Sequence, residues 1–361
     1  MAIITYEIDS GGDIELVLEY LNKQKIVPII TSGGWDDYHV PRYDGNCVLQ
    51  NPTLVERYAV FNIQQDAEDK TTEVRMRVSS RHLILASCTF RTMLEGPWCE
   101  NLLQASHSQS GPVQIKTTDW DAAALAIVMD AIHGRYQDIL KDIHPGLLAR
   151  IATVIDYYAC HENLQPISDI WMTGVRGTYP VPDVYCKSSL VWLYISWVFS
   201  KLDIMLPISR MLLRRISGLS FINSEDLPIG HILEKIDIKR QQCIGRFMSG
   251  LNALRKQLSD EEGCPVAKNP YCSATMLGIL IREQQKLRLL DPPPAAPYSG
   301  YNLAFFISAS NAFPSSRPDR GKDRQGLYKY KSCTCIITWR LTYVGLEIGK
   351  DINGYDLTVL Q

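Results

Sequence analysis

Hydrophobic and polar positions alternate with a period of two in several short stretches of the first half of the chain. Residues 3–8 and 14–20 alternate in this way around a glycine-rich turn at residues 9–13, a pattern typical of a β-hairpin. Residues 74–78 and 113–115 show the same alternation and predict two further strands. The first half of the chain therefore predicts a small β-sheet.

Apolar residues at helical spacing accompany these strands. Two short helices are predicted over residues 81–94, with Phe90 and Met93 directed inward. A longer helix is expected from Asp119 to His133, and a last one begins at Pro145. The order strand, helical pair, strand, helix and helix predicts the α+β class, in which a helical cluster covers a small sheet.

The second half of the chain is predicted to be all-α. Apolar residues recur three and four positions apart over residues 188–202, after Pro207, over residues 228–258 and over residues 276–290. The longest of these segments permits packing within the chain or pairing as a coiled coil. Lys239 at a seam position and two interrupting glycines favour packing within the chain.

Breaks in these patterns divide the chain. Prolines and glycines mark a linker over residues 166–187, so we expect a first domain over residues 1–165 and a mostly helical domain over residues 188–361. The first domain contains a long insertion, residues 22–72, which we expect to be a partly disordered excursion. The alternative is that residues 58–63 form another strand of the sheet.

Composition and charge narrow the class of protein. The chain has 361 residues, of which 46% are hydrophobic, and a net charge of −2, so no general attraction to nucleic acid or anionic membranes is expected. No apolar run reaches the ~20 residues of a membrane-spanning helix, and the first residues lack a secretory signal. We therefore expect a soluble intracellular protein, cytoplasmic and/or nuclear, with no membrane partner.

No sequence motif indicates catalysis. A nucleophile elbow, a phosphate loop, a dinucleotide fingerprint and a zinc-protease helix are all missing from the sequence. His82 is a single histidine without a base partner, so a structural role is favoured over a catalytic one. We expect no enzyme activity and no cofactor.

Ten cysteines occur without any Cys-x-x-Cys pair, and reduced thiols are expected in an intracellular protein. Cys264 and Cys272 are separated by seven residues, and Cys333 and Cys335 follow downstream. Four thiolates in one place would suit a structural zinc ion. The spacing of Cys333 and Cys335 is short for two ligands of one metal, so a metal-free interpretation is favoured.

Several stretches of the sequence belong together as a recognisable set. They are Val78 to Ser87, Phe90 to Gly96, Ile132 to Arg135, Ile155 to Cys160 and, farther along, Leu227 to Ile236. These stretches and the order of elements resemble the BTB/POZ domain, as found in a large family of fungal proteins. The resemblance covers most of the chain apart from residues 22–72.

This resemblance implies several structural features. Residues 14–18 would form the first core strand, and residues 74–78 would pair with it. The end of the chain, residues 333–360, would be helical, although its alternating pattern is also typical of a strand.

The resemblance also implies a protein-interaction module that carries two binding surfaces. One is the face of a homodimer, which would be self-complementary. Its residues here would be Ile14, Leu16, Leu18, His82 and Leu83.

The second surface would bind a cullin. Its residues would include Phe90 and Met93, and Trp98 and Glu100 match the hydrophobic-x-Glu motif of cullin-binding members. Trp98 would be a large apolar anchor, and the alternative is that it covers the local core, because three-residue motifs recur by chance.

The leading hypothesis is therefore a protein-interaction module, in particular a substrate-recruiting adaptor of a cullin-type ubiquitin ligase. The alternative is a scaffold or transcription-associated regulator that only oligomerises. A third hypothesis, nucleic-acid binding through basic residues 210–215 and 317–324, is disfavoured by the near-neutral charge.

Overall fold

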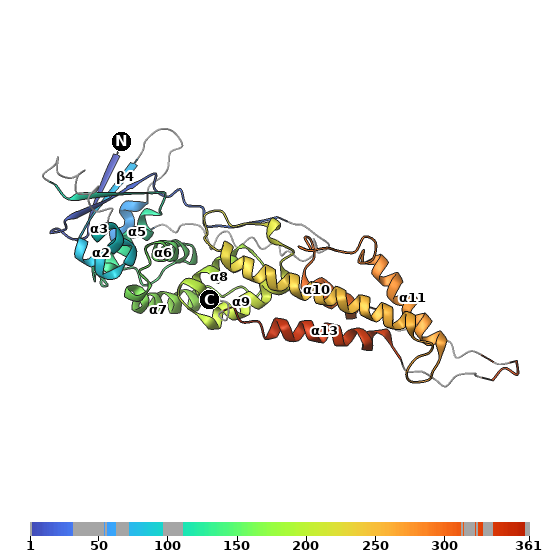
Figure 1. Cartoon of the computed structure of the whole chain (residues 1–361). Helices are drawn as coiled ribbons and strands as arrows, with labels where there is room; N and C mark the ends of the chain where they lie inside the picture. Colours follow the sequence, from blue (N-terminus) through green and yellow to red (C-terminus); the bar gives the residue numbers. More distant parts are fainter. Residues whose placement is uncertain are drawn as a thin grey trace. The chain divides into compact units, whose positions relative to one another are not determined.

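The computed structural model describes residues 2–31, 54, 56–62, 72–96, 111–311, 313, 322, 324–327 and 335–357. They belong to two compact units (Figure 1). Unit 1 comprises Met1–Ile30, Pro41–Ile208 and Ser224–Gly230, and unit 2 comprises Thr31–Val40, Ser209–Asn223 and His231–Gln361. The chain combines a small sheet with many helices, which confirms the predicted α+β class.

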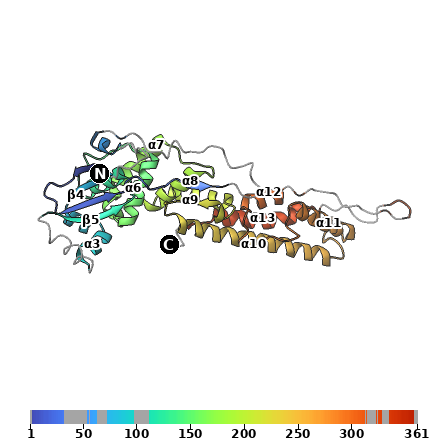
Figure 2. The same cartoon turned by 90° about the horizontal axis from the view of Figure 1, so that it is seen from above.

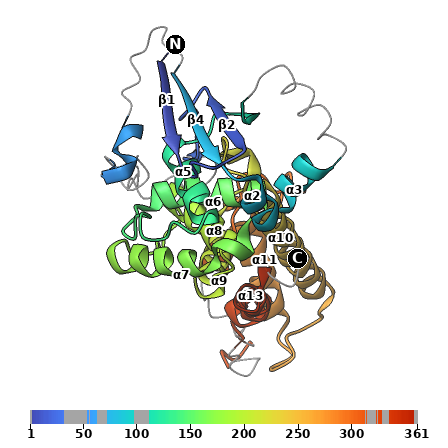
Figure 3. The ribbon, with the colours of Figure 1, turned by 90° about the vertical axis from the view of Figure 1, so that its left-hand side faces the viewer.

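A four-stranded sheet forms one layer of unit 1. Its spatial order is β1 (Ala2–Glu7), β4 (Thr72–Val78), β2 (Ile14–Glu19) and β5 (Val113–Thr118). β2 runs antiparallel to β4 and parallel to β5, while β1 runs parallel to β4. Figure 3 shows β1, β4 and β2 side by side, with α5 (Ala122–Ile132) next to them.

The predicted hairpin between the first two strands is wrong, because β4 lies between β1 and β2. Alternation identifies a strand but says nothing about its neighbours. β4 pairs with a strand on each side, and the side chains of Val74, Met76 and Val78 are all buried. The predicted pairing of residues 74–78 with the strand that begins at Ile14 is confirmed, with Leu16 opposite Met76.

Helices cover this sheet and complete unit 1. Every residue of α5 is buried, which accounts for its nearly uniform apolar sequence. Asp121 caps α5 by accepting a hydrogen bond from the amide of Ala124 at 2.9 Å, so the predicted start at Asp119 is two residues early. The other helices are α2 (Ser80–Ala86), α3 (Cys88–Glu95), α6 (Pro145–Tyr158), α7 (His161–Thr178) and α8 (Lys187–Val198).

The linker predicted over residues 166–187 is largely helical and lies within unit 1. Pro166 stands inside α7. Proline inside a helix costs about 3 kcal/mol, but α7 buries an apolar face that includes Trp171 and Val175. The compact units instead divide after Ile208. That division falls within α9 (Leu202–Arg215), which begins before Pro207 and not after it as expected.

The described residues of the insertion include the short strand β3 (Ile29–Ile30) and one helix of unit 1. The short 3₁₀ helix η1 (Glu56–Phe61) buries Tyr58 and Phe61. The alternative of a strand over residues 58–63 is therefore wrong. The predicted disorder falls mostly on residues 32–53 and 63–71, which lie outside the described residues.

Unit 2 is mostly helical, as the sequence predicts. Its long helix α10 buries a row of apolar side chains that includes Ile236, Phe247 and Leu251, so the prediction of packing within the chain is confirmed. The helical alternative for the end of the chain is also confirmed by α13, which lies alongside α10 in Figures 1 and 2. The elements are α10 (Gly230–Asp260), α11 (Pro270–Lys286), α12 (Leu303–Asn311), α13 (Ile337–Asn353), η2 (Leu219–Phe221) and β6 (Ile222–Asn223); the short β3 (Ile29–Ile30) belongs to unit 1.

A buried arginine fixes one segment of unit 2. The guanidinium of Arg240, in α10, bonds the carboxylate of Asp237 at 2.7 Å. It also donates to the backbone carbonyls of Pro297, Tyr298 and Tyr301, at 2.7, 3.0 and 2.6 Å. Carbonyls of an irregular segment need such partners when water is excluded. Arg240 therefore anchors the segment before α12 to α10.

The turn before β2 gives a sharp test of the fold. A β-carbon at Gly12 would lie 2.5 Å from the carbonyl oxygen of Val78, whereas one at Gly11 would meet nothing closer than 3.5 Å. We expect Gly12→Ala to lower the free energy of unfolding by about 1–3 kcal/mol, because the backbone of β4 must move. Gly11→Ala should change it by no more than about 0.5 kcal/mol. Chemical denaturation measures both, and equal stability of the two variants would contradict this arrangement.

Candidate functional site

The helices α2 and α3 carry residues of both predicted binding surfaces, and several of their side chains are exposed. Ser87 ends α2 and caps α3, because its side chain accepts a hydrogen bond from the amide of Phe90 at 3.0 Å. The same hydroxyl donates to the backbone carbonyl of Tyr158, so it ties the junction of the two helices to α6.

Two of the four predicted cullin-facing residues have described positions near this junction. Phe90 is fully buried and its ring stacks on that of Tyr158, with the centroids 4.4 Å apart. Phe90 is thus part of the core and presents no surface to a partner, because its helix turns it toward α6. Met93 is half-buried at the surface. Trp98 and Glu100 lie outside the described residues.

A shallow depression and an exposed leucine lie on this helical pair. The depression has a volume of about 330 Å³ and is lined by Cys88, Thr89, Thr92 and Met93. Leu85, near the end of α2, is 77% exposed. Leu85 falls within residues 81–86, the helix of the dimer face that the resemblance implies, but it was not singled out there, although a signal was present. Residues 83–85 are consecutive apolar residues, and at about 100° per residue they cannot all face the core of one helix.

The residues predicted for a dimer face are mostly core residues. Ile14, Leu16, Leu18 and Leu83 are buried within unit 1. Ile14, Leu16 and Leu18 belong to the interior strand β2 and Leu83 belongs to α2, and all four side chains pack into the core of unit 1. His82 is exposed, and its ring lies 4.8 Å from that of His133. The described positions of these residues therefore do not form one free face.

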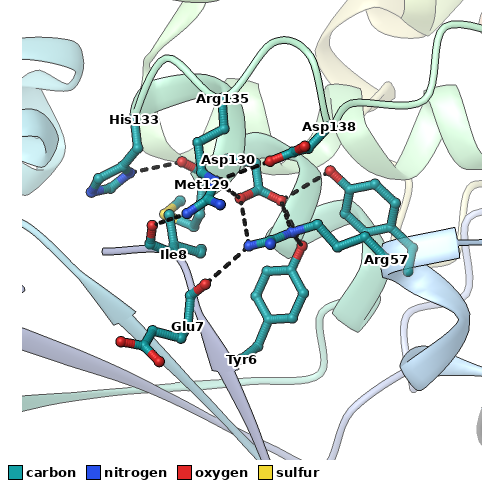
Figure 4. Close-up of polar contacts among 10 residues, drawn as sticks. Tyr6, Glu7, Ile8, Arg57, Met129, Asp130, His133, Arg135 and Asp138 are labelled. Atoms are coloured by element: carbon teal, nitrogen blue, oxygen red, sulfur yellow. Dashed lines mark hydrogen bonds and ion pairs between the residues drawn. The ribbon is translucent and has the colours of Figure 1, made fainter. Parts of the chain in front are cut away.

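A buried carboxylate lies where β1, η1 and α5 meet (Figure 4). Asp130 of α5 is fully buried. It accepts hydrogen bonds from the hydroxyls of Tyr6, at 2.6 Å, and Tyr58, at 2.9 Å. The guanidinium of Arg57 bonds both oxygens of Asp130 at 3.3 Å and lies over the ring of Tyr6, 4.4 Å from its centroid. We call these four residues the Asp130 cluster.

The electrostatics of the Asp130 cluster keep its tyrosines neutral. Burial, and next the neighbouring carboxylate of Asp130, raise the pKa of Tyr6 above its usual value. The pKa of Tyr58 is raised for the same reasons. A phenol that stays protonated donates a hydrogen bond but supplies no base or nucleophile. The arrangement therefore joins the insertion to the sheet and to α5. Its sequence signal was the single acidic residue within the apolar segment 122–132.

A partly buried histidine lies next to the Asp130 cluster. The ring of His133 donates from Nδ1 to the carbonyl of Met129 at 2.8 Å and accepts from the amide of Ser79 at 2.9 Å through Nε2. Burial lowers the pKa of His133, and its bond to Met129 offsets this only in part. The neutral imidazole thus satisfies the backbone at the start of α2.

Three cysteines of unit 2 are brought together, although Cys335 is far from Cys264 and Cys272 in the sequence. The sulfur atoms of Cys264, Cys272 and Cys335 all lie within 4.8 Å of one another. These are three of the four cysteines that the sequence analysis grouped, and Cys333 lies outside the described residues. Thiolates at this spacing are the ligands that zinc prefers in proteins.

Among the described residues no helix has both the length and the apolar character needed to cross a membrane. Comparison with models of known protein families finds no match, and comparisons with curated proteins and with solved structures find none either.

The Asp130 cluster predicts a large effect of one substitution. Asp130→Asn removes the charge that faces Arg57 and leaves buried donors unsatisfied, so the free energy of unfolding should fall by about 3 kcal/mol. Asp138→Asn is the control, because that side chain is 42% exposed and should contribute less than about 0.5 kcal/mol. Urea denaturation of both variants tests this. A loss below about 1 kcal/mol for Asp130→Asn would contradict the structural role.

His133 predicts a dependence of stability on pH. An unfolded histidine has a pKa of about 6.5, and burial lowers the pKa of His133 in the folded chain. Below about pH 6.5 the unfolded chain therefore binds a proton that the folded chain excludes, so stability falls as the pH falls. Above that pH, neutral His133 makes its full contribution to the free energy of unfolding.

The measurement is the free energy of unfolding between about pH 7 and about pH 5. His133→Gln should show a shallower decline than the unsubstituted chain. An unchanged slope in His133→Gln would refute the assignment.

Proposed function

We propose that the chain is a protein-interaction module of the BTB/POZ type and that the exposed face of α2 and α3 binds a partner protein. The observation that carries the proposal is the arrangement of elements in unit 1. The pair β2 and β4, the helices α2 and α3, the strand β5 and the helices α5 and α6 follow in the order that the resemblance implies. The order of the elements and the pairing of the strands together indicate this fold more specifically than any single stretch of the sequence does.

The chemistry of the α2–α3 face supports partner binding. Leu85 of α2 offers a large exposed side chain, and Met93 of α3 lines the depression. Exposed apolar side chains and the residues that line a hollow provide anchors that a partner desolvates on binding. Methionine adapts its shape to different partners. A face of this kind suits a helix or loop of another protein.

A cullin is the partner class that we favour. The support is the match of Trp98 and Glu100 to the motif of cullin-binding family members, directly after α3 in the sequence. Under this proposal the chain is an adaptor, and unit 2 carries the recognition of a substrate or a structural role. The proposed activity is binding, with no catalytic residues assigned.

The test is capture of a purified cullin by the full chain. We expect the unsubstituted chain to bind and Leu85→Asp and Met93→Asp each to weaken binding about tenfold or more, because a charge in the contact is left without a partner. Ile170→Asp is the matched control, since Ile170 is an isoleucine of α7 that is 49% exposed. It should bind like the unsubstituted chain.

Solution mass and far-ultraviolet circular dichroism of each variant separate loss of contact from loss of fold. Failure of the well-folded, unsubstituted chain to bind any cullin would contradict the adaptor function. A dimeric mass together with that failure would favour the oligomerising scaffold instead. Equal binding by all three variants would contradict the α2–α3 face as the contact.

A further inference from the structure

Three cysteine sulfurs converge at one end of the helical pair α10 and α11. Cys264 lies in the turn between the two helices, Cys272 in the first turn of α11, and Cys335 two residues before α13. Their sulfur atoms lie within 4.8 Å of one another. Cys264 and Cys272 are buried, and Cys335 is partly exposed. The three cysteines come from three different segments of the chain, and thiol groups brought together in this way are typical ligands of a metal ion.

The turn that carries Cys264 is built tightly around its sulfur. The backbone amide of Ala267 donates to Sγ of Cys264 at 3.3 Å. The amide of Cys264 bonds the carbonyl of Asn269 at 3.1 Å, and the amide of Lys268 bonds the carbonyl of Cys264 at 2.8 Å. A β-carbon at Gly263 would lie 2.6 Å from the carbonyl oxygen of Lys268, so only glycine fits there. Amide donors directed at sulfur stabilise a thiolate.

Two further features favour negative charge at the cluster. Cys272 lies at the start of α11, where the helix dipole stabilises anions. The guanidinium of Arg340, in α13, interacts electrostatically with Cys272 and Cys335. It is held in place by Glu261, whose two carboxylate oxygens it bonds at 2.7 and 3.2 Å. A disulfide would join only two of the three sulfurs and would be neutral, so these charge-stabilising features favour thiolates.

We propose that Cys264, Cys272 and Cys335 bind one zinc ion as thiolates and thereby fasten α13 to the turn between α10 and α11. Zinc–sulfur bonds of about 2.3 Å in a tetrahedron place the sulfur atoms ~3.8 Å apart. The three sulfurs therefore need to approach one another by about 1 Å at most. Thiolate ligands select zinc over magnesium and calcium, which require oxygen. The metal-free interpretation that the sequence favoured is replaced by this proposal.

The proposed metal acts together with the ion pair of Glu261 and Arg340. Both link the end of α10 to the start of α13, and Glu261 also accepts a hydrogen bond from Ser273 of α11 at 3.0 Å. When the ligands come from different segments, the free energy of zinc binding contributes directly to the free energy of folding. Removal of zinc should therefore destabilise unit 2 and leave the partner-binding face of unit 1 intact.

The direct test is the metal content of the full, untagged chain purified without chelator. Elemental analysis should give about one zinc ion per chain. Cys264→Ser and Cys335→Ser should each bind zinc at least about tenfold more weakly. Cys243→Ser is the matched control, because Cys243 is also buried in unit 2 but outside the cluster, and it should keep the metal. Well under half a zinc ion per unsubstituted chain, or iron or copper in its place, would overturn the proposal.

A second measurement needs no substitution and so does not depend on the folding of a variant. Alkylation of the native chain should modify Cys335 slowly and more than about tenfold faster after a strong chelator removes zinc. Exposed Cys88 of α3 should react equally fast before and after. Unchanged reactivity of Cys335, or a disulfide among the three cysteines in the mass spectrum, would overturn the proposal.

Discussion

The pairing of β2 with β4 and β5 is the interaction on which the rest of unit 1 depends. β2 lies inside the sheet and bonds to a neighbour on each side, and its apolar side chains are buried in the core. The partner β4 begins at Thr72, far along the chain, and the close contact of Gly12 with Val78 fixes where the two strands meet. Once this pair is formed, α2 starts directly after β4 and its position is determined.

Polar groups then attach the remaining segments to this frame. Asp130 stands in a helix that is otherwise apolar, and burying its charge is costly unless the partners are complete. Tyr6, Arg57 and Tyr58 supply those partners from β1 and η1, so the insertion is anchored by a side chain of α5. Arg240 has the corresponding role in unit 2, where it holds the segment before α12 through three backbone carbonyls.

The elements were largely predictable from the sequence, because periodicity depends on local burial. The strands that contain Ile14 and Val74, and the helix that begins at Pro145, lie where the pattern placed them. The pairing of β4 with β2 was implied by the family resemblance, but the pairing of β4 with β1 was not predictable, since alternation carries no information about neighbours. The linker predicted around Pro166 was wrong, because the free energy gained by burying the apolar face of α7 exceeds the cost of one lost hydrogen bond.

The candidate site was predicted only in part. The inward direction predicted for Phe90 is confirmed, since its ring stacks on Tyr158 in the core, and for that reason Phe90 is not available to a partner. Met93, which was also expected to point inward, is only half-buried and lines the surface depression. Leu85 was recognisable only from a run of apolar residues too long for one face. The cysteine cluster was suggested by residue type alone, and the proximity of Cys264 and Cys335 required the fold.

The α2–α3 face as a protein-binding surface is the central claim. Hydrogen exchange of the full chain, measured by mass spectrometry with and without a purified cullin, tests it most directly. The account predicts slower exchange of the amides of residues 80–95 in the complex, with α7 unchanged. Protection elsewhere and none over residues 80–95 would contradict it.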